Sequence, residues 1–136
     1  SFYLIKFRTM NINAPSVASH LVNRKFTTRF GRIIRYFKLD ELPQFINVIK
    51  GEMSLVGPRP CLFNQTELIG KRQFYNIFSV KPGVTGLAQI KGIDMSDPEK
   101  LVKVENFMIS NFNQLNYFKY LLFTFYGKGF GDKISF

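Results

Sequence analysis

Leu39-Asp40-Glu41-Leu42-Pro43-Gln44 lies within residues 29–60, the most informative part of the sequence. Asp40 is the first acidic residue of the chain, because the thirty-nine residues before it hold eight Lys or Arg and no carboxylate. Asp40 is expected to cap a helix with Pro43 in its first turn, where the missing N–H costs nothing. Apolar residues follow with helical spacing, and Gly51 should end this helix; they are Leu42, Phe45, Ile46 and Ile49.

The flanking sequence predicts the remaining elements. We expect a strand over residues 2–10, a loop over 11–19 and a basic amphipathic helix over 27–35, capped by a threonine. Further along, the patterns predict a short strand or extended segment over 53–56, irregular structure over 57–60 and a helix over 64–75. A turn over 80–86, a strand over 87–90 and a loop over 91–97 should follow. The last two elements are expected to be helices over 98–110 and 116–126, the second ended by the glycines at 127, 129 and 131. The expected fold class is α+β: residues 1–136 form one compact, mainly helical domain with a small β-hairpin or sheet and interfacial amphipathic helices.

Length and charge limit the possible functions. With 136 residues the chain has room for one modest core. Nineteen basic and nine acidic residues leave a charge of +10, which favours an anionic partner: nucleic acid, a phospholipid surface or a phosphorylated substrate. One cysteine and one histidine exclude a disulfide framework and a Cys/His zinc cluster. No apolar run is long enough to span a bilayer, and the abrupt start at Ser1 suggests that an N-terminal segment is missing.

The adjacent acids suggest chemistry on phosphate. An ionised Asp40 near a phosphate can act as a nucleophile and form an acyl phosphate, while Glu41 holds Mg²⁺ to offset the charge repulsion. Alternatively, Asp40 is only a helix cap and Glu41 a solvated acid. The basic neighbours Arg35 and Arg59 favour the first interpretation, since Arg59 lies between Pro58 and Pro60, where its guanidinium can be held rigidly for phosphate.

The aromatic residues gather near the C-terminus, where ten of the twenty-two lie between residues 107 and 136. The helix expected over 116–126 is apolar almost all round, interrupted by Lys119. It is either a buried core helix or a helix lying in a membrane interface, where aromatic and Lys side chains are favoured.

Five motifs in order carry a resemblance to a known family: residues 6–10 (KFRTM), 28–32 (TRFGR), 39–44 (LDELPQ), 53–60 (MSLVGPRP) and 80–89 (VKPGVTGLAQ). In these segments, and to about residue 133, the chain resembles the bacterial sugar transferase family, the monotopic polyprenyl-phosphate phosphoglycosyl transferases. That family carries an N-terminal hydrophobic helix that re-enters the membrane. The chain is therefore expected to be a catalytic domain that lacks this helix.

The resemblance implies transfer of a phospho-sugar from a UDP-sugar to polyprenol (undecaprenyl) phosphate, with release of UMP, as the initiating membrane step of bacterial surface glycan synthesis. It implies that Asp40 is the nucleophile that carries the phospho-sugar covalently and that Glu41 binds Mg²⁺. By the same resemblance, substrate contacts are assigned to Arg35, Pro58, Arg59 and Pro60. The implied location is the cytoplasmic face of the inner membrane, with the membrane surface as a partner and no nucleic acid.

Other interpretations remain open from the sequence alone. A basic non-enzymatic module could bind anionic lipid headgroups or nucleic acid. The aromatics lie near the C-terminus and the basic run in the first third, which argues against one nucleic-acid groove. An inactive scaffold of the same family is a third possibility, because the residues at 37–38 and 91–93 depart from the common family pattern. The donor sugar and the oligomeric state stay undetermined.

Overall fold

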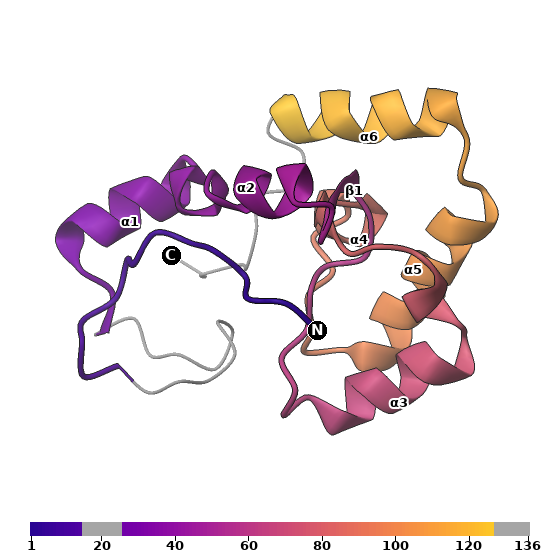
Figure 1. The fold of residues 1–136 in the computed structure, drawn as a ribbon, viewed down its shortest axis with the longest axis horizontal. Helices are drawn as coiled ribbons and strands as arrows, with labels where there is room; N and C mark the ends of the chain where they lie inside the picture. Colours follow the sequence, from indigo (N-terminus) through magenta and orange to yellow (C-terminus); the bar gives the residue numbers. More distant parts are fainter. Residues whose placement is uncertain (15–25, 127–136) are drawn as a thin grey trace.

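A computed structural model describes residues 1–14 and 26–126 of the chain, and its arrangement is drawn in Figure 1. The helices are α1 (Arg29–Tyr36), η3 (Leu39–Glu41), α2 (Gln44–Ile49), α3 (Thr66–Phe74), η4 (Ile77–Ser79), α4 (Leu87–Ile90), α5 (Pro98–Ser110) and α6 (Gln114–Phe125), where η marks a 3-10 helix; the strands are β1 (Ser54–Val56) and β2 (Gly83–Thr85). The α+β class is thus confirmed. Most of the helices expected from the sequence are present within a few residues of their predicted bounds.

The sheet has two parallel strands rather than a hairpin. Ser54 pairs with Gly83 and Val56 with Thr85. The strand expected over 53–56 is confirmed, whereas the turn expected over 80–86 is wrong for the residues that form β2. A Cβ atom on Gly83 would lie 2.0 Å from the backbone nitrogen of Gly57, so only glycine allows the two chains to come this close.

Two further strand predictions are wrong. Residues 87–90 form the helix α4, which follows an extended Gly86. Residues 2–10 form no regular strand, and their one β-bridge within the described residues is the antiparallel pair of Met10 and Thr27. A short apolar run fits either a strand or a buried helix, and a β-favouring segment needs a neighbouring strand before it can form a ladder.

The core lies in two clusters around α5. The first packs α3, η4, α4 and α5 together through Leu68, Ile77, Ala88, Leu101 and Val102. The second joins β1, α5 and α6 through Val56, Met108 and Tyr120. A hydrogen bond of 2.6 Å between the Thr85 and Thr124 hydroxyls adds a polar link from β2 to α6. The body of the domain is therefore the part that holds β1, β2 and the segments next to them in place.

The N-terminal segment runs alongside α1 and α2 (Figure 1). The buried side chain of Asn47 holds it: the amide nitrogen donates to the Tyr3 carbonyl at 2.8 Å, and the amide oxygen accepts from the Ile5 backbone N–H at 3.1 Å. Farther along, Thr28 caps α1 by accepting from the Gly31 N–H at 2.8 Å. A Cβ on Gly31 would lie 2.1 Å from the Thr9 carbonyl oxygen, so this glycine lets the segment pass close under α1.

Three helices, α1, α2 and α6, leave apolar side chains in solvent; on α1 these include Phe30 and Ile33. On α2 the polar residues Gln44 and Asn47 are buried, whereas the apolar ones point outward and Ile49 is 85% exposed. On α6 only Tyr120 is buried, and Phe125 is 92% exposed. Among the described residues, no helix combines the length and the apolar character that crossing a membrane requires. These helices are amphipathic, with apolar faces that the domain itself does not cover.

Candidate active site

The acidic pair lies in the 3-10 turn η3, between α1 and α2. Lys38 precedes this turn with a left-handed backbone (φ 54°), which reverses the chain direction after α1. The prediction that Asp40 caps the next helix is wrong, because α2 begins at Gln44 and Pro43 occupies its N-cap position. The Asp40 carbonyl instead accepts a hydrogen bond of 3.1 Å from the backbone N–H of Phe7. The pair is therefore fixed by a turn and by the N-terminal segment.

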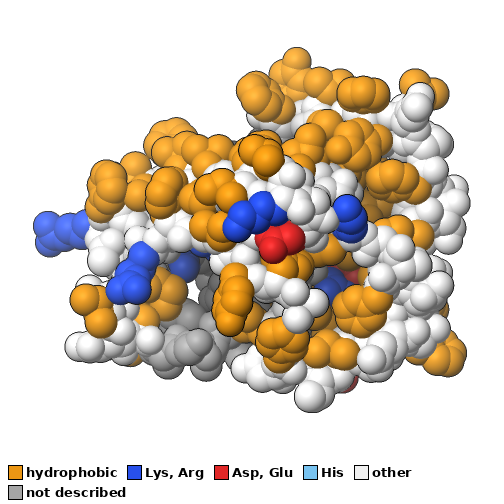
Figure 2. All heavy atoms as spheres, viewed as in Figure 1, with side chains coloured by type: hydrophobic (Ala, Val, Ile, Leu, Met, Phe, Trp, Pro, Cys, Tyr) orange, Lys and Arg blue, Asp and Glu red, His pale blue; other side chains and the backbone are white. Residues whose placement is uncertain are grey.

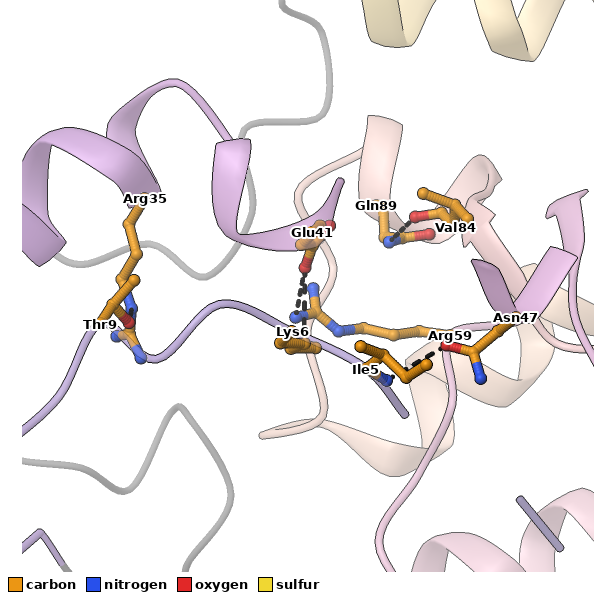
Figure 3. A network of polar contacts seen from close by, with 9 residues as sticks. All are labelled: Ile5, Lys6, Thr9, Arg35, Glu41, Asn47, Arg59, Val84 and Gln89. Carbon is orange, nitrogen blue, oxygen red and sulfur yellow. Dashed lines mark hydrogen bonds and ion pairs between the residues drawn. The ribbon is translucent and has the colours of Figure 1, made fainter. Parts of the chain in front are cut away.

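Glu41 lies between two cations that come from distant parts of the chain. The Arg59 guanidinium approaches its Oε1 to 3.4 Å, and the Lys6 ammonium approaches the same oxygen to 3.7 Å (Figure 3). The side chains of Glu41 and Arg59 are each 19% exposed, so both are largely shielded from solvent but remain accessible. A partly desolvated cluster of this kind strengthens charge interactions relative to open water.

The loop at residues 57–60 is anchored against the sheet. The Gly57 N–H donates to the Thr85 carbonyl at 2.8 Å, and the Gly83 N–H donates to the Pro58 carbonyl at 2.8 Å. Pro58 is buried and Pro60 half-buried, and each ring restricts its own φ angle. Arg59 therefore extends toward Glu41 from a rigid base, as expected from the sequence.

Arg35 occupies the last turn of α1, on the same side of η3 as the N-terminal segment. Its Nε donates to the Thr9 hydroxyl at 2.8 Å. Arg35 also acts electrostatically on Asp40, whose pKa it lowers. The structure thus brings Arg35 and Arg59 to the acidic pair from two sides.

Effects of opposite sign act on the pKa of Asp40, so this residue does not behave as one half of a simple ion pair. Burial raises the pKa of Asp40, and the charge of Glu41 raises it further, while Lys6 and Arg35 lower it. Burial likewise lowers the pKa of Lys38, against the opposing effects of Glu41 and Asp40. A carboxylate whose charged form is disfavoured is a stronger base, and its ionised oxygen is better suited to attack an electrophile.

The site suits a cation that is shared with a phosphate ligand. Within residues 1–14 and 26–126, His, Cys, Asp and Glu form no cluster of three or more that could hold a metal ion. Mg²⁺ commonly binds through one or two carboxylates together with substrate phosphates. The hard oxygens of Asp40 and Glu41, next to guanidinium and ammonium groups that fit phosphate, meet that description.

The family model described as "Bacterial sugar transferase" matches residues 1–128. The chain belongs to the bacterial sugar transferase family. Among the sugar transferases it resembles, the "Uncharacterized sugar transferase EpsL" of Bacillus subtilis is 41% identical over 112 residues, 82% of this chain and 55% of that protein.

Two relatives have names that state a reaction. The "UDP-glucose:undecaprenyl-phosphate glucose-1-phosphate transferase" of Caulobacter vibrioides is 41% identical over 96 residues, 68% of this chain and 36% of its own length. The "Undecaprenyl-phosphate galactose phosphotransferase" of Salmonella typhimurium is 35% identical over 132 residues, 85% of this chain and 28% of its own length. The chain thus spans between about a quarter and just over half the length of these curated sugar transferases.

Sequence reasoning missed three residues of this candidate site. Lys6 was part of a family motif but received no role, although it contacts Glu41. Thr9 holds Arg35, and Lys38 provides the turn that presents the acidic pair. Lys6 and Thr9 could have been noticed because they belong to the motif at residues 6–10. Both precede Asp40 by more than thirty residues, however, so the sequence did not indicate that they lie near the acidic pair in the fold. The only sequence feature that drew attention to Lys38 was that residues 37–38 differ from the common family pattern.

Proposed function

We propose that this chain transfers a phospho-sugar from a UDP-sugar to polyprenol phosphate through a covalent intermediate on Asp40. The observation that carries the proposal is the convergence on the Asp40–Glu41 pair of three cations from separate segments, Lys6, Arg35 and Arg59. Cationic groups around a nucleophilic carboxylate are what an attack on a diphosphate requires, since they offset the charge of the donor. The names of the relatives support the same reaction class.

The first half-reaction forms the intermediate. An Asp40 carboxylate oxygen attacks the β-phosphorus of the UDP-sugar, a P–O bond forms, and the bond from that phosphorus to the bridging oxygen breaks. UMP leaves with the bonding electron pair, and the sugar phosphate remains as an acyl phosphate on Asp40. Arg59 and Lys6 are placed to bind the diphosphate oxygens as charge moves toward the leaving UMP.

The second half-reaction regenerates the carboxylate. A phosphate oxygen of the polyprenol phosphate attacks the same phosphorus, and the bond to Asp40 breaks. The products are a polyprenyl diphosphate sugar and free Asp40. Because UMP leaves before the polyprenol phosphate reacts, the kinetics should be ping-pong.

Mg²⁺ is the cofactor that we propose, and Glu41 is the residue that would hold it together with donor phosphate oxygens. Bound there, the ion would supply positive charge that reduces the repulsion between Asp40 and the diphosphate. Arg59 and Lys6 would then contact the phosphates rather than Glu41. Pro58 and Pro60 would act by fixing the backbone from which Arg59 extends.

The membrane surface is the proposed partner, on its cytoplasmic side. Hydrophobic side chains gather along the upper edge of the molecule in Figure 2, over α1, α2 and α6. We call this surface the apolar face; its exposed residues are Phe30, Ile33, Phe37, Phe45, Ile46, Ile49, Leu115, Phe118, Leu122 and Phe125. Amphipathic helices of this kind lie in the interface plane with the apolar side in the lipid. The polyprenol phosphate would then reach Asp40 from the bilayer.

The proposal is tested by following UMP release. The chain is incubated with Mg²⁺, vesicles containing undecaprenyl phosphate, and each of a panel of UDP-sugars. We expect UMP release with at least one donor, loss of turnover on removal of Mg²⁺, and no release by Asp40→Asn. The matched control is Asp94→Asn, because Asp94 lies on the loop between α4 and α5, away from the acidic pair in sequence. Normal turnover by Asp40→Asn would contradict the assignment of the nucleophile.

A further inference from the structure

Helix α6 has an outer side that is exposed and an inner side that packs on the domain. Tyr120 and Thr124 lie one turn apart on the inner side. Tyr120 is buried against Val56 of β1 and Met108 of α5, and Figure 1 shows α6 running along the upper edge of the molecule next to β1. The exposed apolar residues follow one stripe on the outer side: Leu115, Phe118, Leu122 and Phe125. The helix therefore lies between the outer part of the apolar face and the sheet.

Two threonine hydroxyls join α6 to β2 in a bond of fixed direction. The Thr124 hydroxyl donates its one proton to the Tyr120 carbonyl at 2.8 Å, so it accepts in the 2.6 Å bond with Thr85. Thr85 is 5% exposed, and its buried hydroxyl would be costly without a partner. The pair thus holds the end of β2 against the inner side of α6.

The backbone of the same strand holds the loop that carries Arg59. The Thr85 carbonyl accepts from the Gly57 N–H at 2.8 Å, and at the other end of β2 the Gly83 N–H donates to the Pro58 carbonyl at 2.8 Å. Arg59 is the next residue of the chain. A continuous series of hydrogen bonds therefore runs from α6 through β2 to the base of this loop.

Contact with lipid should strengthen this series. Helix α6 has 12 residues, a length at which a helix depends on packing for its stability. Its outer stripe is exposed in water but would be buried in a lipid interface. Because lipid binds the ordered helix better than a frayed one, it shifts α6 toward the state in which Thr124 meets Thr85.

We propose that Thr85 and Thr124 are positioning residues that couple the contact of α6 with lipid to the placement of Arg59. Lipid orders α6, the hydroxyl pair fixes β2, and β2 fixes the loop from which the Arg59 guanidinium reaches the diphosphate. Neither threonine touches substrate. This coupling rests on the proposed function, because it takes the membrane surface as the partner of α6 and the diphosphate as the ligand of Arg59. Vesicles that contain no polyprenol phosphate should therefore accelerate the first half-reaction, in which lipid is not a reactant.

The test compares two double variants, one of which keeps the hydroxyl pair. Thr85→Val with Thr124→Val removes both hydroxyls, leaves neither unpaired and keeps the shape of the side chains, so the fold should be retained. Thr85→Ser with Thr124→Ser keeps both hydroxyls. UMP release is followed in a single turnover without polyprenol phosphate, with and without vesicles of phosphatidylglycerol and phosphatidylethanolamine. We expect vesicles to accelerate the wild type and the Ser variant about 2- to 10-fold, the range that one hydrogen bond supports, and to leave the Val variant near its vesicle-free rate.

Two controls separate this coupling from binding and from a general effect of the substitution. The Val variant should float with vesicles as the wild type does, because the outer stripe of α6 is unchanged. Thr66→Val, at an exposed position at the start of α3, should keep the acceleration of the wild type. A Val variant that vesicles accelerate as strongly as the wild type would overturn the proposal. Equal loss in the Ser and Val variants would also overturn it, because the hydroxyls would not be the cause.

Amide hydrogen exchange tests the coupling on the wild-type chain, without a variant and without turnover. The Gly57 amide, which donates to the Thr85 carbonyl, should exchange more slowly when the chain is bound to vesicles. Exchange at Gly57 that bound vesicles leave unchanged, or a chain that does not bind them, would exclude the coupling whether or not any variant folds. Should the wild type release no UMP from any UDP-sugar, the proposed reaction fails, while the exchange data still decide whether α6 couples lipid to the loop.

Discussion

The charged form of Asp40 is disfavoured in the folded chain. Burial and the adjacent Glu41 raise its pKa above the ordinary value of 3.8, so ionisation is less favourable in the folded chain than in the unfolded one. At neutral pH, where the side chain is charged, this difference destabilises the fold. If Asp40 is the nucleophile that we propose, this loss of stability accompanies its function, as is common at catalytic sites.

Asp40→Asn should therefore raise the thermal stability of the protein while abolishing its proposed activity. We expect an increase in Tm of about 1–3 °C at pH 8, because the substitution removes a disfavoured charge without changing the shape of the side chain. The difference should narrow as the pH falls toward the ordinary value of 3.8, because the raised pKa lets the folded chain take up the Asp40 proton before the unfolded chain does. Thermal unfolding by circular dichroism at both pH values checks this.

The control for the stability prediction is Asp97→Asn. Asp97 caps α5 by accepting from the Lys100 N–H at 3.0 Å, so it belongs to a helix terminus rather than to a like-charge pair. This substitution should leave Tm unchanged or lower it. A lower Tm for Asp40→Asn than for the wild type would show that the Asp40 carboxylate stabilises the fold and would contradict this account of its environment.

At the scale of elements, a single amide joins the N-terminal segment to α2. Asn47 accepts from the Ile5 N–H, and its amide nitrogen donates both to the Tyr3 carbonyl at 2.8 Å and to Glu52 Oε2 at 2.6 Å. The segment that it holds also carries Lys6, one of the cations of the acidic pair. Asn47 thus holds against α2 the segment that places Lys6 next to the acidic pair.

Asn47→Ala should release this segment. We expect a loss of about 1–3 kcal/mol in the free energy of unfolding, because buried backbone groups lose their partner, and faster hydrogen exchange over residues 3–7. Chemical denaturation and exchange mass spectrometry measure the two effects. Asn116→Ala is the comparison, since its amide donates to the Asn111 carbonyl at 2.9 Å in an exposed position. Unchanged exchange at residues 3–7 would show that other contacts hold the segment.

The elements that the sequence predicted well are those with local signals. Thr28 as a cap, Gly51 as a terminator with φ +74° and Pro98 at the start of α5 all act within one turn of their own helix. The predictions failed where the partner was remote. β2 needs β1, some 29 residues earlier in the chain, and the N-terminal segment pairs with the side chain of Asn47 instead of a strand.

The same distinction applies to the site. Asp40, Glu41 and Arg59 were recognised by motif, and the structure brings Arg59 to Glu41. Lys6 was not assigned a role, because its contact with Glu41 joins residues that are 35 positions apart in the sequence. The spacing of apolar residues in the sequence also failed to predict which face of α2 is buried. The apolar stripe of α2 is typical of a core-facing helix. Ile49 nevertheless lies in solvent, because Gln44 and Asn47 face inward.

At the scale of the whole molecule, the apolar face should determine binding to lipid. Phe118→Glu on α6 and Ile49→Glu on α2 each place a charge where apolar contact with lipid is expected. Each should weaken binding to anionic vesicles about tenfold or more, because burying a Phe or Ile side chain is worth about 1.5–3 kcal/mol. Flotation with vesicles of phosphatidylglycerol and phosphatidylethanolamine measures the bound fraction.

The matched control for lipid binding is Phe74→Glu. Phe74 is 83% exposed but ends α3, on the opposite edge of the molecule from α6 in Figure 1. Its substitution should leave vesicle binding unchanged. If Phe74→Glu weakened binding as much as Phe118→Glu, the contribution of the apolar face would be non-specific, and the proposed orientation on the membrane would be wrong.

The whole account depends on the covalent step at Asp40. The most direct measurement is mass spectrometry of the chain after brief reaction with the UDP-sugar that supports UMP release, in the absence of polyprenol phosphate. We predict an added mass equal to one sugar phosphate, located by peptide analysis on Asp40, lost on addition of polyprenol phosphate and absent in Asp40→Asn. Release of UMP with no adduct under rapid quenching, or an adduct on any other residue, would contradict the account.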